Sequence, residues 1–545
     1  MKSSERKISS SESPLGMVST ASKQATEAGV KILKKGGNAI DAAVASAFCI
    51  GVTEPQASGL GGQSMVLVYL EEGKRVFALD GSSRAPFGIQ PHKTPKTAIK
   101  TGLKSTTVPS TPATLGYMHE KYGKLSLATV MEPAILAAEE GFVVSQLQYE
   151  LMSKHAELLR QDPLILKNYF KDHEPIEVGG IIRQPELAKC LIRMAEAGWH
   201  DFYIGSIGNK IVQDMEKRDG LISFTDLSQI PQPVEREVLT SSYRDYEIHT
   251  FPPPGAGRVL VQLLNILENF PPDMLNTADP AGATIFALAF RMALTDRQRM
   301  PMHPDYYLQT VNKMMTDKTY AQELSDRIHQ IGKFSFPELF KPPITSGETT
   351  HLSVSDNEGN SVGITQSIEL VFGSKTMADG LGFFYNNYMS AFDYKNMAHP
   401  FYLLPGGKPW SSVAPTLLFH QGKPKYLLGS PGSERISTTL AQVISRLVDG
   451  GMDLPSAIAA PRFHSSHAGV LQIEKSRFDP KVLETLEQTG FSIKNRGAYS
   501  FYLGCVQGIS IPQGQGELFC GVADPRRDGT AKGPKYLSNN RGRLV

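Results

Sequence analysis

Two threonines, Thr349 and Thr350, are adjacent in the sequence. The second begins a stretch of alternating polar and apolar residues, THLSVSD. A threonine hydroxyl is a weak nucleophile and needs a base beside it, and a threonine at a chain end can use its own α-amine as that base. An internal threonine reaches that state when its hydroxyl attacks the carbonyl of the preceding residue, here Glu348, and the peptide bond is cut. Thr349 is therefore a candidate nucleophile. On this evidence alone a structural threonine at the start of a strand is the simpler interpretation.

A turn rich in glycine and proline offers a second chemical element. The stretch LLGSPGSERIST predicts a strand, a turn and the start of a helix, with Gly432 and Ser433 in the turn. Consecutive backbone N–H groups at such a turn can bind a developing oxyanion. In PWSSVAPT, Ser411 and Ser412 could offer hydroxyl groups to a carboxylate. Each of these signals is weak when taken alone.

His351 follows the threonine pair and raises the alternative of a threonine–histidine pair. Because side chains in a strand alternate between faces, His351 can share a face with Thr349. We expect His351 to be structural, since the α-amine of Thr349 already supplies the base.

The elements that must position these residues form a β-rich last third behind an irregular connector. Residues 333–348, KFSFPELFKPPITSGE, lose periodicity and carry three prolines, which predicts an exposed, extended connector. Two β-runs around NEGN, at 350–356 and 360–368, then predict a hairpin.

The rest of the chain has helical and strand patterns that predict a layered α/β/β/α sandwich. Residues 1–15 are rich in serine and charge, and we expect a disordered tail there. Asn38 is placed to cap a buried helix of small residues. Residues 115–331 are expected to be mostly helical. The other predicted elements are helices at 19–33, 38–52 and 436–449, and strands at 64–70, 74–80, 243–251, 416–419 and 425–428.

Composition limits the class of protein. The 545 residues are 41% hydrophobic and 20% charged with a net charge of +2, which is typical of a soluble globular protein and argues against a nucleic-acid surface. Neither a signal-peptide pattern nor an apolar run of about 18 residues occurs, so we expect no membrane span and a cytoplasmic location. The four cysteines (Cys49, Cys190, Cys505 and Cys520) are expected to be buried free thiols.

Taken together, these stretches resemble the γ-glutamyltransferase family of N-terminal-nucleophile hydrolases, from about Gly16 to Arg527. The matching pieces, in chain order, are GGNAIDAAVASAFCIGVTEPQASGLGGQSMVLVY, HEKYGKLSLATVMEPAILAAEEGF, FPPPGAGRVLVQLLNILE, TTHLSVSDNEGNSVGITQS, the asparagine pair at 386–387, PWSSVAPT, GSPGSERI and ADPR at 523–526. The resemblance implies a four-layer αββα sandwich built jointly by two autocleaved subunits. These are a large subunit, 16–348 after the tail, and a small subunit, 349–545.

The resemblance also implies roles for individual residues. Thr349, freed by cleavage after Glu348, would attack a γ-glutamyl amide to form an acyl-enzyme that water or an amine resolves. By match to the family, Gly432 and Ser433 form the oxyanion hole, where typical members have two glycines. The other matched positions are Thr365 and Ser367 near the nucleophile, and Asn387, Ser411 and Ser412 near the substrate.

The substrate-binding stretches depart from the family pattern. In LDGSSRAP, Ser82 stands where the family has the arginine that binds the glutamyl α-carboxylate, and Arg84 follows two residues later. Ala391 replaces the acidic residue that binds the α-amine, with Asp393 two positions further on. Glu369 replaces an asparagine that helps with the amine. Arg84 could reach the carboxylate if its loop shifts, and Glu369 could neutralise the ammonium group.

Three functions therefore remain open. The first is an amidohydrolase and acyltransferase acting on γ-glutamyl amides such as glutathione, with transfer to water or to an amino acid or peptide amine. The second uses the same machinery on another acyl group, as cephalosporin or glutaryl acylases do. The third is an uncleaved, inactive scaffold. The chemistry requires no metal or organic cofactor, and the expected partners are a small-molecule amide, its acceptor and the two subunits themselves.

Overall fold

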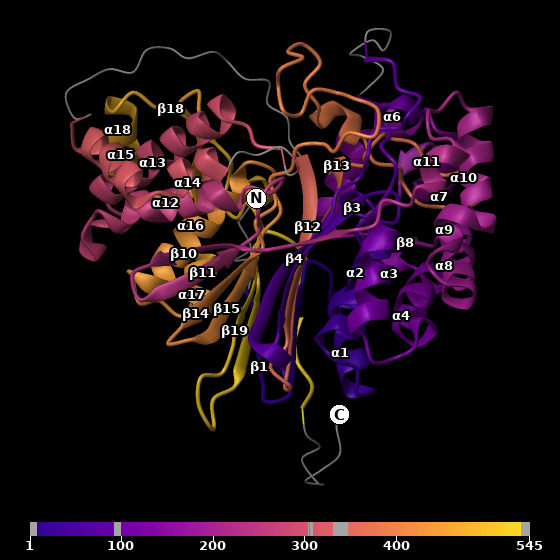
Figure 1. Ribbon diagram of the computed structural model, residues 1–545, viewed down its shortest axis with the longest axis horizontal. Helices are drawn as coiled ribbons and strands as arrows, with labels where there is room; N and C mark the ends of the chain where they lie inside the picture. Colours follow the sequence, from indigo (N-terminus) through magenta and orange to yellow (C-terminus); the bar gives the residue numbers. More distant parts are fainter. Residues whose placement is uncertain (1–7, 92–99, 304, 306–308, 331–346, 536–545) are drawn as a thin grey trace.

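Two antiparallel sheets lie face to face at the centre of the molecule (Figure 1). The computed structural model describes residues 8–91, 100–303, 305, 309–330 and 347–535. In this part of the chain the first sheet has seven strands in the order β1 (Ser9–Ser13), β20 (Phe519–Ala523), β19 (Gln507–Ser510), β15 (Lys423–Gly429), β14 (Thr416–His420), β11 (Tyr246–Thr250) and β10 (Leu239–Tyr243). The second has seven in the order β21 (Thr530–Lys532), β2 (Gly16–Thr20), β12 (Gly347–Asp356), β13 (Ser361–Leu370), β3 (Gln63–Leu70), β4 (Arg75–Gly81) and β9 (Val234–Arg236).

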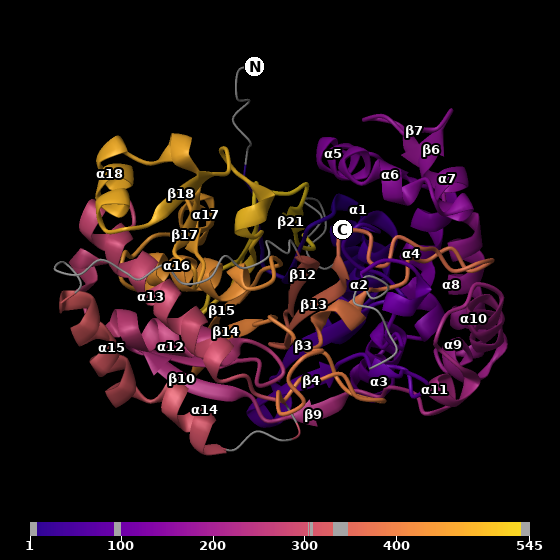
Figure 2. The ribbon, with the colours of Figure 1, turned by 90° about the horizontal axis from the view of Figure 1, so that it is seen from above.

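Helices cover the outer face of each sheet, which completes a four-layer αββα sandwich (Figures 1 and 2). The helices on the side of the second sheet are α1 (Lys23–Lys34), α2 (Ala39–Thr53), α3 (Thr111–Tyr122), α4 (Leu127–Glu140) and α8 (Pro185–Ala197). Those on the side of the first sheet are α12 (Gly257–Glu268), α13 (Pro280–Arg299), α15 (Lys318–Gln330), α16 (Arg435–Val448), α17 (Leu454–Ala459) and α18 (Pro480–Gln488).

Shorter elements complete the chain. The remaining helices are α5 (Gln146–Lys154), α6 (Ala156–Leu159), α7 (Pro163–Tyr169), α9 (Asp201–Ile204), α10 (Ser206–Lys217), α11 (Phe224–Ser228) and α14 (Gln309–Thr316). The remaining strands are β5 (Phe142–Val143), β6 (Phe170–Lys171), β7 (Glu174–Pro175), β8 (Ile181–Ile182), β16 (Phe463–Ser465), β17 (Val470–Ile473) and β18 (Ser492–Asn495).

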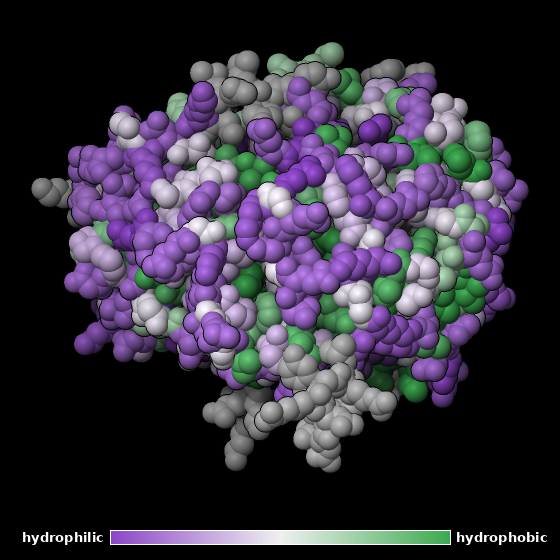
Figure 3. All heavy atoms as spheres, turned by 60° about the horizontal axis from the view of Figure 1, so that its bottom comes forward, coloured by the Kyte–Doolittle hydropathy of each residue, from purple (hydrophilic) through white to green (hydrophobic). Residues whose placement is uncertain are grey.

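Apolar side chains fill the three spaces between these four layers. Between the sheets, Met17, Leu67 and Tyr69 of the second sheet share one cluster with Leu417 and Ile509 of the first. Two larger clusters lie between each sheet and its helices. The face shown in Figure 3 carries mostly hydrophilic residues with hydrophobic ones scattered among them. Burial of apolar area in these three spaces is the main force that stabilises the sandwich.

The buried helix α2 begins where its sequence predicts. The side chain of Asn38 accepts a hydrogen bond from the backbone N–H of Asp41, and the Asp41 carboxylate accepts one from the N–H of Asn38. This reciprocal pair satisfies two of the N–H groups that a helix start leaves unpaired. The helix ends at Thr53, so that Glu54 is its C-cap and lies close to the strand that carries Thr349.

Most of the predicted elements, and the predicted fold class, are confirmed, and the exceptions are local. The helix predicted at 19–33 begins only at Lys23, because Ser19 and Thr20 belong to β2. Ser9–Ser13 is not disordered: it forms the edge strand β1, which pairs with β20. Residues 243–251 are not one strand, because a turn at Arg244, whose φ is 56°, separates β10 from β11. Most of the predicted connector, 331–346, lies outside the described residues, whereas Gly347 and Glu348 already belong to β12.

The remaining expectations from the sequence concern membrane-spanning helices and the state of the cysteines. No helix in the described ranges has both the length and the apolar character needed to cross a bilayer. Cys49, Cys190 and Cys505 are buried free thiols, as predicted, and Cys520 is a free thiol that is only partly buried.

Candidate active site

Thr349 lies at an irregularity in the pairing of β12 with β13. Glu348 pairs with Glu369 and Thr350 pairs with Gln366, so the register shifts across Thr349. The extra residue belongs to β13, because Ser367 and Ile368 together lie opposite the single residue Thr349. The Thr349 hydroxyl is buried and lies 3.3 Å from the hydroxyl of Ser367 on the neighbouring strand.

Ser367 connects the candidate nucleophile with the peptide bond that precedes it. Its hydroxyl donates a hydrogen bond to the carbonyl oxygen of Glu348 at 2.7 Å, and it accepts one from the backbone N–H of Glu369 at 2.9 Å. A donor on a carbonyl oxygen stabilises the negative charge that develops there when the carbon is attacked. In the uncut chain, Ser367 is therefore placed to promote attack of the Thr349 hydroxyl on Glu348.

The predicted oxyanion turn lies beside this strand. Gly432 and Ser433 connect β15 to α16, and both adopt left-handed backbone conformations with φ of 124° and 55°. A methyl group placed on Gly347 would come within 3.0 Å of the Ser433 side chain, so the turn contacts β12 two residues before Thr349. Glycine adopts these conformations without steric cost, whereas a residue with a side chain, such as Ser433, adopts them less readily.

His351 and Thr365 form a separate buried contact. His351 Nδ1 lies 2.8 Å from the hydroxyl of Thr365, and its Nε2 lies 3.2 Å from the hydroxyl of Ser353. Burial lowers the pKa of His351 to about 3, so the ring is neutral. Both ring nitrogens are engaged away from Thr349, in agreement with the structural role expected for His351. Thr365, which was predicted to lie near the nucleophile, contacts His351 in the uncut chain.

A buried arginine from a helix, Arg297, joins the two predicted serines. Its Nη2 donates to the carbonyl oxygen of Ser411 at 2.9 Å and to the hydroxyl of Ser412 at 2.7 Å. Its guanidinium carbon lies 4.9 Å from the centre of the Trp410 ring. The sequence offered no motif at Arg297, which stands near the end of α13, and sequence reasoning missed it.

Two glutamates interact electrostatically with this arginine. Burial raises the pKa of the Glu369 carboxyl to about 7, and the charge of Arg297 opposes that rise. The Glu434 carboxyl has its pKa lowered to about 2, because His464, Arg435 and Arg297 outweigh its burial. The surroundings of Arg297 thus include one carboxylate that is ionised at neutral pH and one that titrates near neutrality.

Three of the predicted substrate-binding residues make other contacts. Ser82 donates its hydroxyl to the carboxylate of Asp80. Arg84 lines a separate small pocket with Phe87, Val108, Asp226 and Gln229 among others. Asn387 accepts a hydrogen bond from the N–H of Leu370 and donates one to the carbonyl oxygen of Lys100, both at 3.0 Å, which fixes the end of β13. Arg297 therefore binds Ser411 and Ser412 by hydrogen bonds and acts on Glu369 through its charge, whereas Arg84 lines a pocket that contains none of these residues.

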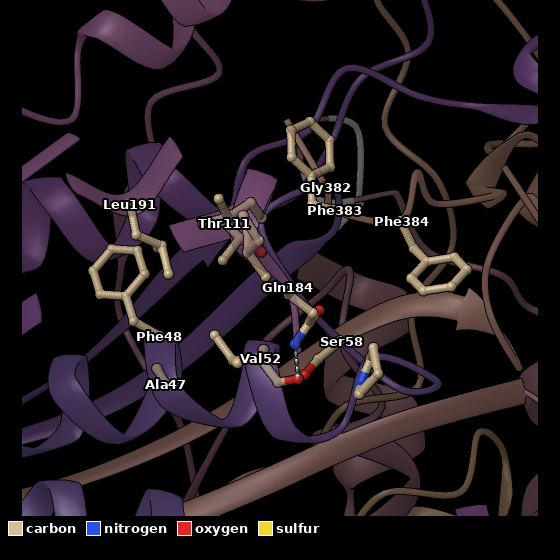
Figure 4. Close-up of a pocket in the computed structure, with 15 residues that line it drawn as sticks. Ala47, Phe48, Val52, Ser58, Thr111, Gln184, Leu191, Gly382, Phe383 and Phe384 are labelled. Atoms are coloured by element: carbon tan, nitrogen blue, oxygen red, sulfur yellow. Dashed lines mark hydrogen bonds between the residues drawn. The ribbon is translucent and has the colours of Figure 1, made fainter. Parts of the chain in front are cut away.

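Another cavity, of about 10 Å³, lies between α2, α8 and the segment 382–384 (Figure 4). Figure 4 shows Gln184 donating a hydrogen bond to the carbonyl oxygen of Val52 at its edge. Its lining has neither acidic nor basic side chains, and its volume holds about one water molecule. We interpret it as a packing defect beneath α2.

The sequence of the chain is similar to those of known enzymes along most of its length. The sequence model of a family described as gamma-glutamyltranspeptidase matches residues 25–533. The chain belongs to the gamma-glutamyltranspeptidase family. A glutathione hydrolase proenzyme of Escherichia coli (strain K12) is 35% identical over 535 residues, which cover 94% of this chain and 90% of that protein. An acylase ACY 1 proenzyme of Pseudomonas sp. (strain V22) is 33% identical and covers 85% of this chain and 84% of its own length.

A solved structure supports the same family. The crystal structure of cephalosporin acylase from Bacillus halodurans superposes with a TM-score of 0.87 at 26% identity, and the match covers 98% of both chains. The fold and the family together make this protein a gamma-glutamyltranspeptidase-type hydrolase and acyltransferase.

Proposed function

We propose that this chain cuts itself before Thr349 and that the freed threonine cleaves γ-glutamyl amides of the glutathione type. The observation that carries the proposal is the hydrogen bond of 2.7 Å from the Ser367 hydroxyl to the carbonyl oxygen of Glu348, with the Thr349 hydroxyl beside it. The relatives named as proenzymes support a precursor that gives large and small subunits.

Self-cleavage begins with the hydroxyl of Thr349. Its oxygen bonds to the carbonyl carbon of Glu348 and the C–N bond breaks, while the hydroxyl proton is transferred to the nitrogen of Thr349, which becomes a free amine. Water then hydrolyses the resulting ester, which leaves a carboxylate on Glu348 and restores the hydroxyl of Thr349. Ser367 stabilises the negative charge on the carbonyl oxygen during the first step.

Turnover repeats this chemistry on a substrate. The α-amine of Thr349 accepts the hydroxyl proton while the oxygen attacks the γ-carbonyl of the substrate, and the amine then protonates the leaving group. The backbone N–H groups of Gly432 and Ser433 bind the oxyanion. Water or an acceptor amine releases the γ-glutamyl group from the threonine.

For the substrate, we propose that Arg297 with Ser412 binds the glutamyl α-carboxylate and that Glu369 binds the α-ammonium. Arg297 donates both of its hydrogen bonds to the serines from Nη2. A planar guanidinium can therefore present its other N–H groups to a carboxylate. In this arrangement Arg297 has the function that the sequence suggested for Arg84 after a shift of its loop.

The experiment that tests the proposal combines intact mass with activity. Division of the 59.6 kDa in proportion to 348 and 197 residues gives pieces of about 38 and about 22 kDa, the smaller beginning at Thr349. Thr349→Ala should leave one uncut chain without activity on a γ-glutamyl anilide. Cleavage of the Thr349→Ala chain would show that the nucleophile is a different residue, and a wild-type chain that stays whole would favour the inactive scaffold.

A second candidate function is the same reaction on another acyl group. It is favoured by the position of Arg84 outside the site and by the relatives named as acylases. A glutaryl group lacks the α-amine, so an enzyme built for it gains nothing from an ionised Glu369. Comparison of kcat/KM for γ-glutamyl and glutaryl anilides decides between the two functions.

A further inference from the structure

The peptide bond that the proposed cleavage breaks is held from both sides by a buried ion network. We propose that Arg527, through Glu348 and Glu54, is a positioning residue for self-cleavage. This inference rests on the proposed cut before Thr349, but it concerns residues that take no part in the chemistry of substrate turnover described above.

The network begins at the residue before the cut. The Arg527 guanidinium donates from Nη2 to the side-chain carboxylate of Glu348. Its Nη1 lies 3.4 Å from the carboxylate of Glu54, the C-cap of α2. The other oxygen of Glu54 accepts a hydrogen bond from the hydroxyl of Thr350 at 2.6 Å.

One guanidinium thereby fixes the residues on both sides of Thr349. Glu348, Arg527 and Glu54 are each no more than 5% exposed, and Thr350 is fully buried. Thr349 lies between them at the register shift of β12, with its hydroxyl near Ser367. Arg527 binds Glu348 directly, and it restrains Thr350 through Glu54. Because both neighbours of Thr349 are held in this way, the hydroxyl of Thr349 and the carbonyl of Glu348 keep the relative orientation that attack requires. A misplacement of about 1 Å in such a geometry can cost about a hundredfold in rate.

The charges in this network explain why an arginine is needed. Burial raises the pKa of Glu348, while Arg527, Arg435 and Lys154 oppose the rise. Burial raises the pKa of Glu54 to about 7 against Arg527 and Thr350, and Glu348 and Asp528 raise it further. Two buried carboxylates therefore share the Arg527 cation, and removal of that cation leaves a buried charge without compensation. Such a charge would draw Glu348 toward solvent and displace the peptide bond.

The experiment follows self-cleavage of the full chain during cell-free synthesis, on denaturing gels, for wild type and Arg527→Gln. We expect Arg527→Gln to cut about ten- to a hundredfold more slowly, and Arg527→Lys to recover part of the rate because it restores the charge without the forked geometry. The Arg527→Gln rate relative to wild type should rise as the pH falls, because protonation neutralises the unpaired Glu348, whose pKa burial raises.

A matched control separates positioning from general stability. Arg244 pairs with Asp449 at 2.9 Å and donates to two backbone carbonyls. It lies in the β10–β11 turn of the first sheet, whereas β12 belongs to the second. Arg244→Gln should lower the thermal midpoint but leave the cleavage rate near that of wild type.

Each outcome decides the matter. If wild type cuts and Arg527→Gln cuts equally fast, the inference is wrong although the proposed function stands. The inference is also wrong if Arg244→Gln slows cleavage as much as Arg527→Gln does. If the wild-type chain itself never cuts, or if Thr349→Ala cuts, it is the proposed function that fails.

Discussion

Glu369 is the residue that should distinguish a γ-glutamyl substrate from a simple acyl group. If it binds the substrate ammonium, it must be ionised, and burial raises its pKa to about 7. Below that pH the carboxyl is protonated and the contact is lost; above it the contact is present. The value of kcat/KM for a γ-glutamyl anilide should therefore rise with pH through about 7 in the wild-type enzyme.

The variant Glu369→Gln removes this charge and keeps the shape. A hydrogen bond to a charged group contributes about 1.5–3 kcal/mol, so we expect a loss of roughly ten- to a hundredfold in kcat/KM for the γ-glutamyl anilide. The pH profile of the variant should then match that for the glutaryl anilide, because only the α-amine of Thr349 still titrates in both. Steady-state kinetics with a glutaryl anilide provides the control, because that substrate has no ammonium group and should be affected little. Equal losses on both substrates would contradict the assignment.

Ser367 should control self-cleavage through its hydroxyl. Ser367→Ala removes the donor to the carbonyl oxygen of Glu348, and loss of one such donor costs about a hundred- to a thousandfold in rate. Ser367→Thr keeps the hydroxyl and should cut within about tenfold of wild type. The appearance of the two fragments over time measures both rates. A Ser367→Ala chain that cuts at the wild-type rate would remove Ser367 from the cleavage mechanism.

At this scale, sequence patterns located the site but not all of its contacts. Thr349, Ser367, Ser411 and Ser412 lie in recognisable motifs. In the structure Thr349 contacts Ser367, and the two later serines contact Arg297. Arg297 lies more than a hundred residues before the two serines and reaches them only because α13 packs against α12, which lies on the first sheet. Nothing local to that helix marks its arginine as different from others, so only the tertiary structure reveals it.

Among the elements, the close contact between α1 and α2 depends on a glycine. A methyl group on Gly29 would come within 2.4 Å of the Ser46 hydroxyl and 3.0 Å of Val18. Ser46 donates that hydroxyl to the carbonyl oxygen of Ala25, so it cannot move without losing a buried hydrogen bond. We expect Gly29→Ala to destabilise the protein by about 1–3 kcal/mol, detected as a lower thermal midpoint.

The same substitution at an open position provides the control. A methyl group on Gly88 would have no heavy atom within 4 Å, and the backbone there is not left-handed. Gly88→Ala should therefore leave the thermal midpoint unchanged or slightly raised. If both variants behave alike, crowding between α1 and α2 is not the cause of the effect.

Elements with strong local signals were predicted, and those that depend on distant partners were not. The alternation around NEGN predicts β12 and β13, and Asn38 predicts the start of α2. The serine-rich segment Ser9–Ser13 has no such signal. It becomes a strand because β20, some five hundred residues away, offers it an edge with which to pair. Strand formation at an edge depends on that partner more than on the intrinsic preference of the segment.

In the whole molecule, strands from both sides of the proposed cut share each sheet. In the first sheet, β1, β10 and β11 precede the cut, whereas β20, β19, β15 and β14 follow it. In the second sheet, β2 lies between β21 and β12, so a strand of the large subunit is enclosed by two strands of the small one. The apolar cluster between the sheets also draws side chains from both parts.

This interleaving predicts that self-cleavage does not separate the subunits. Cut wild-type protein should elute from gel filtration with the same apparent mass as uncut Thr349→Ala, near 59.6 kDa or the same multiple of it. Raised salt should not separate the subunits, because screening weakens exposed ion pairs while backbone ladders and buried apolar contacts persist. Denaturant should release the large and small subunits only as both sheets unfold. Separation of the two fragments in salt alone would show that charge pairs, rather than the shared sheets, hold the cut enzyme together.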